Sequence, residues 1–211
     1  MKDNLKKILC FILIFFLLWI ARQYFYFYVE LSLSDNLRTV SSIVIKVIFW
    51  VLLTFIYSKF VYKENIFKKI KFKNNKKGIF YALIFGLVLL IINLAYNYLS
   101  KGTLFDFNVS VRGFISAVVF APIIEEIIFR AFILNKLEIS LPFFWANLLT
   151  SILFVLIHFP GWLIWGEGIS WETAVSILFV SFIWGYIYKK SGSFLSPILG
   201  HAFNNLITMI V

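Results

Sequence analysis

Long apolar stretches alternate with short polar segments along the whole chain. Seven of them are nearly continuous in apolar residues, and each is about 20 residues long, the length an α-helix needs to cross a bilayer. They are residues 8–28, 39–62, 78–100, 113–134, 141–160, 172–188 and 194–211. Strands of a membrane barrel would instead alternate apolar and polar residues in blocks of about ten. The pattern predicts an all-α, polytopic integral membrane protein with about seven transmembrane helices.

Composition supports a membrane protein. Hydrophobic residues make up 62% of the chain, only 14% of residues are charged, and the mean hydropathy is +0.92, values far from those of soluble globular domains. With 211 residues and seven spans, little chain is left for a separate soluble domain. We expect one continuous membrane domain, with three spans in residues 1–112 and four in residues 113–211.

The net charge of +10 would suggest a nucleic-acid partner in a soluble protein. Here most of the 20 lysines and arginines fall on one side of the predicted spans, with seven lysines in the loop 63–77. Such a bias marks cytoplasmic loops. We therefore expect a multi-pass protein of the cell membrane with a cytoplasmic N-terminus, the lipid bilayer as a partner and no nucleic acid. The excess of lysine over arginine is typical of an AT-rich bacterial genome.

Two adjacent glutamates, Glu125 and Glu126, lie inside the fourth apolar stretch, where a charge is costly. Neighbouring helical residues point about 100° apart, so we expect the two acids not to share one partner. Glu126 and Arg130 are four residues apart and lie on one helical face, where they can form an ion pair. That pair can be structural or catalytic, whereas Glu125 is the candidate general base. Pro122 removes one backbone hydrogen bond and is expected to bend this helix or open it to water.

The two histidines, His158 and His201, also lie in apolar stretches. His158 shares a helical face with Phe154, and His201 shares one with Asn205. Each pair by itself fits interhelical hydrogen bonding as well as catalysis. The span limits place His158 far from the membrane centre, so we expect the fifth span to continue through residues 161–165, with a kink at Pro160 and Gly161.

Three motifs, in the fourth, fifth and seventh apolar stretches, resemble those of a known family. In chain order they are Glu125-Glu126-x-x-x-Arg130, Phe154-x-x-x-His158 and His201-x-x-x-Asn205. Together they resemble the CPBP family of intramembrane proteases, which includes the type II CAAX prenyl proteases and the Abi proteins of bacteriocin processing. The resemblance covers about residues 113–211.

The resemblance implies an intramembrane endopeptidase that cleaves a membrane-associated peptide or protein. Glu125 would activate water with the help of His158, and His201 with Asn205 would hold the water or the oxyanion, while Glu126 and Arg130 would support the site. Two histidines and a carboxylate also suit zinc, in which case Glu125, His158 and His201 would be the ligands. The sequence has no His-Glu-x-x-His motif, and we favour a mechanism without a cofactor.

Two other functions are compatible with the same residues. One is a non-catalytic bacteriocin-immunity or scaffold protein of the membrane. The other is a proton-coupled transporter in which Glu125, His158 and His201 relay protons. A proton relay has no need of the pairing between His201 and Asn205, and the protease is therefore the preferred hypothesis.

Overall fold

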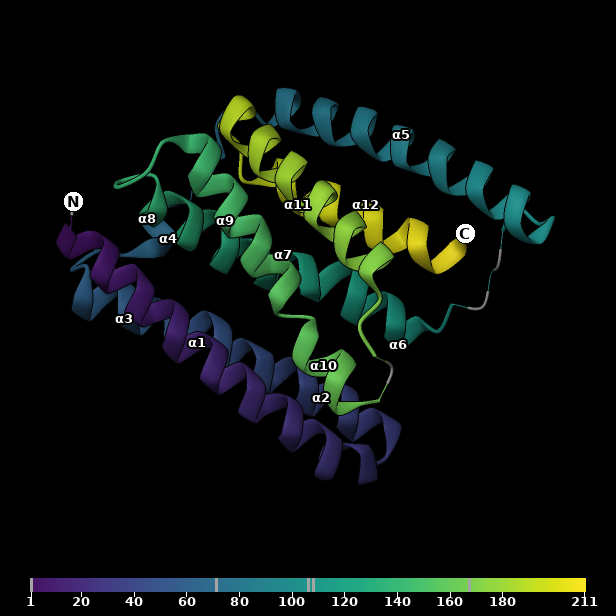
Figure 1. Ribbon diagram of the computed structural model, residues 1–211, viewed down its shortest axis with the longest axis horizontal. Coiled ribbons are helices and arrows are strands. Elements are labelled where there is room, and N and C mark those ends of the chain that lie inside the picture. Colours follow the sequence, from purple (N-terminus) through teal and green to yellow (C-terminus); the bar gives the residue numbers. More distant parts are fainter. Residues whose placement is uncertain (1, 71, 106, 108, 167) are drawn as a thin grey trace. The chain divides into compact units, whose positions relative to one another are not determined.

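All seven predicted apolar stretches are helical in the computed structural model (Figure 1), which describes residues 2–70, 72–105, 107, 109–166 and 168–211. In chain order the helices are α1 (Lys2–Tyr28), η1 (Glu30–Ser32), α2 (Asp35–Lys46), η2 (Val47–Leu52), α3 (Leu53–Val61), α4 (Ile66–Lys69), α5 (Asn75–Lys101), α6 (Val111–Gly113), η3 (Phe114–Phe120), α7 (Ala121–Glu126), η4 (Ile127–Leu134), α8 (Asn135–Leu137), α9 (Phe143–Leu156), α10 (Phe159–Ile164), α11 (Trp171–Ser191) and α12 (Leu195–Ile210). The described residues contain no β-strand beyond one isolated bridge. The all-α prediction is confirmed.

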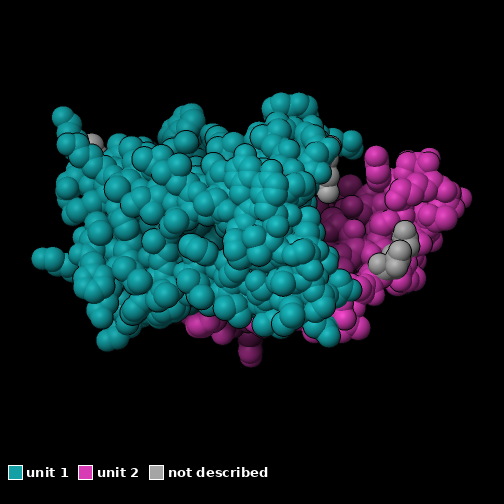
Figure 2. All heavy atoms as spheres, turned by 90° about the horizontal axis from the view of Figure 1, so that it is seen from below, with its two compact units in different colours: residues 1–70, 127–186 teal, residues 71–126, 187–211 magenta. Residues whose placement is uncertain are grey.

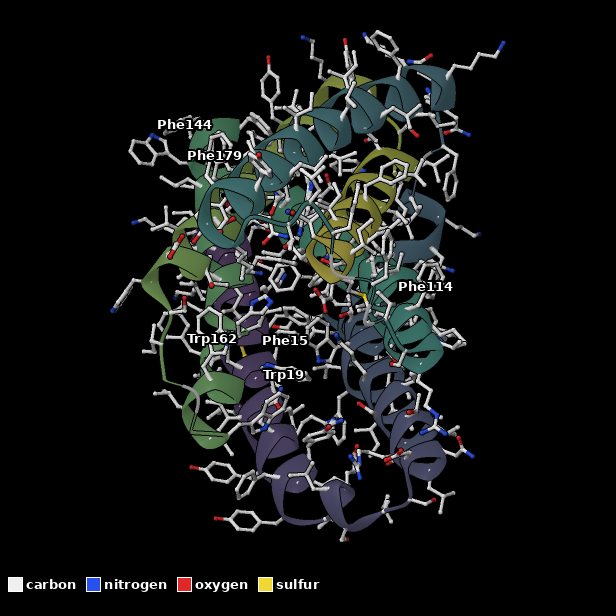
Figure 3. All side chains as sticks on the ribbon, turned by 90° about the vertical axis from the view of Figure 1, so that its right-hand side faces the viewer. Phe15, Trp19, Phe114, Phe144, Trp162 and Phe179 are labelled. Atoms are coloured by element: carbon white, nitrogen blue, oxygen red, sulfur yellow. The ribbon has the colours of Figure 1, made fainter. Side chains whose placement is uncertain are left out.

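Among the described residues, five helical stretches are long and apolar enough to cross a membrane. They are Lys2–Ser32, Asp35–Val61, Asn75–Lys101, Phe143–Ile164 and Trp171–Ser191. Large aromatic side chains point outward, among them Phe144 and Phe179, which are 54% and 60% exposed (Figure 3), as expected for surfaces that meet lipid. The chain is a polytopic membrane protein. The number seven stays a prediction, because the stretch 113–134 changes helix type three times and α12 has only 16 residues.

The chain divides into two compact units, coloured in Figure 2. Unit 1 contains residues 1–70 and 127–186, and unit 2 contains residues 71–126 and 187–211. Each unit combines segments from the first and the second half of the sequence. The chain passes from unit 2 to unit 1 between Glu126 and Ile127, inside the fourth apolar stretch. The expectation of one continuous membrane domain stays a prediction.

The core of unit 1 is aromatic. Phe15 and Trp19 project from α1 into the interior (Figure 3), and Trp50 of η2 contacts both, with ring centroids 4.9 and 4.7 Å away. Phe129 of η4 and Phe154 of α9 extend this cluster, with centroids 4.9 Å apart in an edge-to-face arrangement. Such pairs add stabilisation beyond the area they bury. The cluster holds the elements of unit 1 around α1.

The fifth span continues through Ile164, as expected from the sequence, but its interruption lies earlier than Pro160 and Gly161. α9 ends at Leu156, and α10 begins at Phe159. Pro160 lies in the first turn of α10, where its missing N–H leaves no intrahelical bond unmade. The carbonyl of Ile157, freed by the break, accepts a 2.6 Å hydrogen bond from the indole Nε1 of Trp19. A side chain of α1 therefore supplies the donor that the helix lacks.

Unit 2 is built around α12, which packs against α5, η3 and α7. α5 and α12 approach closely at Gly86, where an added Cβ would lie 3.3 Å from the ring of Phe203. Near the start of α12, Ser193 donates a 2.7 Å hydrogen bond to Asn75 of α5. These contacts hold α12 in place along α5.

The basic loop 63–77 includes the short helix α4. Glu64, its acidic residue, forms a 2.7 Å ion pair with Lys136 of α8. Lys71, one of the loop lysines, lies outside the described residues. Within unit 1 the loop is therefore joined to α8 by a partly buried charge pair.

α9 and α11 approach closely at Gly185 of α11. The side chain of Asn147 in α9 donates a 2.9 Å hydrogen bond to the carbonyl of Phe182. A Cβ added at Gly185 would lie 1.8 Å from Oδ1 of Asn147. The absence of a side chain at Gly185 therefore lets α9 bond to the backbone of α11.

Gly185→Ala is expected to destabilise the protein by about 1–3 kcal/mol, the usual range for overpacking a tight interface. Gly161→Ala in α10 is the matched control, because a Cβ there meets no atom within 4 Å. Thermal unfolding in detergent measures both variants. A Gly185→Ala protein as stable as the control would contradict this account of the interface.

Candidate active site

Glu125 and Glu126 are the last two residues of α7, and both are buried. Glu125 is 6% exposed and Glu126 is fully inaccessible. α12 packs against α7 and places His201, which is 4% exposed, beside them. Three ionisable side chains are thus gathered in the interior of unit 2.

The imidazole of His201 lies between the two carboxylates. Its Nδ1 is 3.0 Å from Oε1 of Glu126, and its Nε2 is 3.8 Å from Oε2 of Glu125. The expectation that adjacent glutamates do not share a partner is therefore wrong here. The two acids diverge along α7, but an imidazole has nitrogens on different edges of its ring and meets one carboxylate with each.

The hydrogen bond to Glu126 determines the proton position on a neutral His201. A carboxylate only accepts hydrogen bonds, so Nδ1 carries the hydrogen and Nε2 keeps its lone pair. The 3.8 Å separation between Nε2 and Glu125 exceeds a direct hydrogen bond. One water or substrate oxygen placed beside both atoms could contact each of them. Glu126 therefore orients the ring. The Glu125 carboxylate and Nε2 of His201 are then placed to contact the same water or substrate oxygen.

Asn205, one turn after His201, binds the backbone of η3. Its Nδ2 donates a 2.8 Å hydrogen bond to the carbonyl of Ala117. η3 is π-helical, and the N–H of Ala121 donates to Ser116, five residues earlier. The same register would pair residue 122 with Ala117, but Pro122 has no N–H. The Asn205 side chain supplies the donor that Pro122 lacks.

This contact gives Asn205 a role that sequence reasoning did not anticipate. The motif suggested an amide that holds water or an oxyanion beside His201. The described contacts instead place one N–H of that amide on the backbone near α7, which positions α12 and its histidine relative to the glutamates. Pro122 was the available signal, because a proline beyond the first turn of a helix leaves one carbonyl without its donor.

His158 lies in unit 1, at the break between α9 and α10. Its Nδ1 is 2.9 Å from the carbonyl of Phe154, so Nδ1 donates and Nε2 keeps the lone pair in the neutral ring. The ring centroids of His158 and Phe154 are 5.6 Å apart. The shared face expected for these two residues is confirmed, and the tautomer of His158 suits a base or an acceptor at Nε2.

Arg130 of η4 also lies in unit 1 and is fully buried. Its Nη2 donates to the backbone carbonyl and to the hydroxyl of Ser181 on α11, at 2.9 and 2.7 Å. Its guanidinium carbon lies 5.0 Å from the centroid of Phe154 and 5.6 Å from that of Trp184. Sequence reasoning missed Ser181, although a serine in the middle of an apolar helix is itself a signal of a polar contact.

The predicted site residues thus form two groups. Glu125, Glu126 and His201 meet in unit 2, with Asn205 on the same helix as His201. His158 and Arg130 both contact Phe154 in unit 1. The pairing of Glu126 with Arg130, and the joining of His158 to the glutamates, stay predictions.

The side chains gathered in unit 2 provide fewer ligands than a zinc ion needs. A catalytic zinc site takes three protein ligands and one water. Unit 2 offers two, the carboxylate of Glu125 and Nε2 of His201, because Nδ1 of that histidine is engaged by Glu126. Within the described part of the chain, no three His, Cys, Asp or Glu side chains are grouped closely enough to hold a metal ion. The residues as they lie do not form a zinc site.

Comparison with known proteins places this chemistry in a family. Residues 107–207 match the family model described as type II CAAX prenyl endopeptidase, Rce1-like. Over this segment the chain is similar to that protease family. The match contains all three motifs, and it confirms the family inferred from them. No curated protein and no solved structure matches the chain, and the roles of the individual residues stay predictions.

Asn205→Ala is expected to destabilise the protein by about 1 kcal/mol, because the partly buried carbonyl of Ala117 loses its donor. The loss should be smaller in a Pro122→Ala background, because an N–H at residue 122 can then donate to Ala117. Asn204→Ala is the control, since its amide makes only a 3.4 Å contact with Asn205. Thermal unfolding of the four proteins and the double variant measures the coupling. An equal loss in both backgrounds would show that Pro122 and Asn205 act independently.

Proposed function

We propose that the protein is an intramembrane endopeptidase that hydrolyses a peptide bond with a water activated by Glu125. Similarity to a protease family supports peptide hydrolysis. The observation that carries the mechanism is the arrangement of Glu126, His201 and Glu125, in which one buried imidazole is held by one acid and presented to the other.

In the proposed reaction the Glu125 carboxylate takes a proton from water as the oxygen attacks the scissile carbonyl. The tetrahedral intermediate then collapses, and the protonated Glu125 gives the proton to the leaving amine. Burial of Glu125 supports this role, because it keeps the carboxylate away from bulk water and beside His201. The protons balance, and Glu125 is regenerated.

His201 acts in this proposal through Nε2, which contacts the water before attack or, in the protonated ring, donates to the oxyanion. Glu126 holds the ring in the required orientation and its negative charge stabilises the imidazolium. This arrangement resembles the way a buried carboxylate orients the catalytic histidine of a serine protease. Glu126 is therefore a positioning residue.

The remaining motif residues complete the site as proposed from the family resemblance. His158 would assist the water through its Nε2 atom, and Arg130 would add positive charge near Glu126. Asn205 holds α12 against η3 and can give its second N–H to the oxyanion. We propose a reaction without a metal ion, because zinc would need His158 as its third ligand in addition to the two groups of unit 2.

The proposed substrate is a membrane-associated peptide or protein that reaches the site from the bilayer. Small peptide precursors, such as those of bacteriocins, fit a bundle with little chain outside the membrane. We further propose that the protein is in a bacterial cell membrane with its N-terminus in the cytoplasm. The lysines of the loop 63–77 support that orientation.

Glu125→Gln is expected to reduce the cleavage rate roughly a hundred- to ten-thousand-fold, the usual contribution of a general base. The amide retains the shape of the carboxylate but has no basic oxygen of comparable strength. The assay uses purified protein in proteoliposomes and a mixture of synthetic peptides, with products identified by mass spectrometry and the metal content of each sample measured. Glu172→Gln on the exposed start of α11 is the control. Cleavage by Glu125→Gln at the wild-type rate would remove Glu125 from the mechanism.

Glu126 can be tested by comparing two substitutions. Glu126→Gln keeps an oxygen that accepts from Nδ1 of His201 but loses the charge, whereas Glu126→Ala loses both. We expect kcat to fall in the order wild type, Gln, Ala, with KM nearly unchanged, because Glu126 acts through the histidine. A change in KM alone, or equal kcat values for the two variants, would contradict the positioning role.

A further inference from the structure

Arg22, near the end of α1, is a second buried guanidinium that the proposed protease chemistry does not use. It is 5% exposed, and its partner Glu30 in η1 is fully inaccessible. One nitrogen makes both of its polar contacts, since Nη2 lies 3.2 Å from Glu30 Oε2 and donates to the hydroxyl of Ser42 at 2.9 Å. The guanidinium carbon also lies 5.1 Å from the ring centroid of Tyr26.

The other two nitrogens of Arg22 are donors without acceptors. Nε and Nη1 are buried and have no hydrogen-bond partner among the described residues. Together these atoms carry three N–H groups. Buried polar groups are nearly always hydrogen-bonded, because each unsatisfied one costs free energy. A buried arginine with three unused donors therefore indicates an acceptor that comes from outside the chain.

Arg22 lines an apolar groove of about 410 Å³ within unit 1. The other lining residues are Leu18, Ala21 and Phe25 of α1, Ile45 of α2 and Phe49 of η2. Ala21 and Phe25 are exposed on the surface of the described structure. The groove therefore opens outward between the first two candidate membrane spans, Lys2–Ser32 and Asp35–Val61. Its walls suit a hydrocarbon chain, and its one charged wall residue suits an anion.

The length of α1 allows the guanidinium of Arg22 to approach the level of lipid headgroups. Arg22 follows Lys6 by 16 residues, which is about 24 Å along an α-helix, whereas the hydrocarbon core is about 30 Å thick. With Lys6 at one interface, Arg22 lies just inside the other. The length of an arginine side chain spans the remaining distance.

The charges around this end of unit 1 also favour an anion. The ionisable side chains on η1 and α2 are Glu30, Asp35, Arg38 and Lys46. With Arg22 they make three cationic and two anionic groups. Arg38 and Asp35 are 3.5 Å apart, and Lys46 lies over the rings of Trp19 and Trp50, with Nζ 4.7 Å from the latter centroid. One negative charge added at Arg22 would bring the group to neutrality.

We propose that this groove binds one glycerophospholipid, with its phosphate accepting hydrogen bonds from the Arg22 guanidinium after a rotation of that side chain toward the groove. One acyl chain lies along the apolar walls formed by α1, α2 and η2. A phosphodiester combines the oxygens that the guanidinium lacks with the hydrocarbon that the groove accommodates. The ligand would join α1 to α2 at the end of the hairpin opposite the N-terminus.

The experiment uses the purified, delipidated full-length protein and native mass spectrometry in detergent. The probes are phosphatidylglycerol and a diacylglycerol with the same acyl chains, which differ only in the phosphate headgroup. We expect phosphatidylglycerol to bind at least about tenfold more tightly, as charge-assisted hydrogen bonds predict. Equal binding of the two probes, or binding of neither, would overturn the proposal.

Three variants locate the site. In the first, Arg22→Met is combined with Glu30→Met, which replaces the ion pair with apolar groups and usually preserves folding. In the second, Ala21→Trp fills the groove from its exposed wall and leaves the ion pair intact. Arg112→Met, at an exposed arginine of unit 2, is the control.

Phosphatidylglycerol binding is expected to weaken about tenfold in the first two variants and to remain unchanged in Arg112→Met. Monodisperse elution and thermal unfolding verify that each protein is folded. If the double variant does not fold, Ala21→Trp still decides the question, because wild-type binding by that variant would place the lipid elsewhere. The measurement needs no peptide substrate, so its result is independent of the proposed protease activity.

Discussion

Burial of ionisable groups in apolar helices is the constraint on which this structure depends. A charge inside a membrane protein must find a partner, because no water is available to solvate it. The contact between Glu126 and His201 meets this requirement in unit 2, and it simultaneously determines which ring nitrogen faces Glu125. The same interaction that makes burial tolerable therefore also prepares the groups for chemistry.

The helix irregularities follow the same rule for backbone groups. At two places where a helix loses an internal hydrogen bond, a side chain from another element of the same unit supplies the missing donor. Asn205 does so for the carbonyl of Ala117, and the indole of Trp19 does so for the carbonyl of Ile157. Each irregularity lies within a few residues of a motif residue. These two hydrogen bonds therefore help to position the nearby motif residues, Glu125 and His201 in unit 2 and His158 in unit 1.

The two buried arginines of unit 1 are stabilised in different ways. Arg130 donates twice to Ser181 and stacks against two aromatic rings. Arg22 makes its polar contacts through one nitrogen, its other two nitrogens have no partner among the described residues, and its side chain lines an apolar groove. The first arrangement is that of a structural or positioning group within a packed core. The second is that of a binding group, which is why the lipid proposal rests on Arg22.

The sequence by itself determined the fold class, the places of the helices and the family, because hydropathy and motif order are properties of the chain alone. It also identified Glu125, Glu126 and His201 as unusual, since charges in apolar runs need a reason. Only the tertiary structure decided that Glu126 binds His201, that Asn205 replaces the donor absent at Pro122, and that the fifth span breaks at residues 157 and 158. Helical periodicity tells which residues share a face. It does not tell which neighbouring helix that face meets, or which atom of a ring or amide makes the contact, because those depend on packing between segments far apart in the chain.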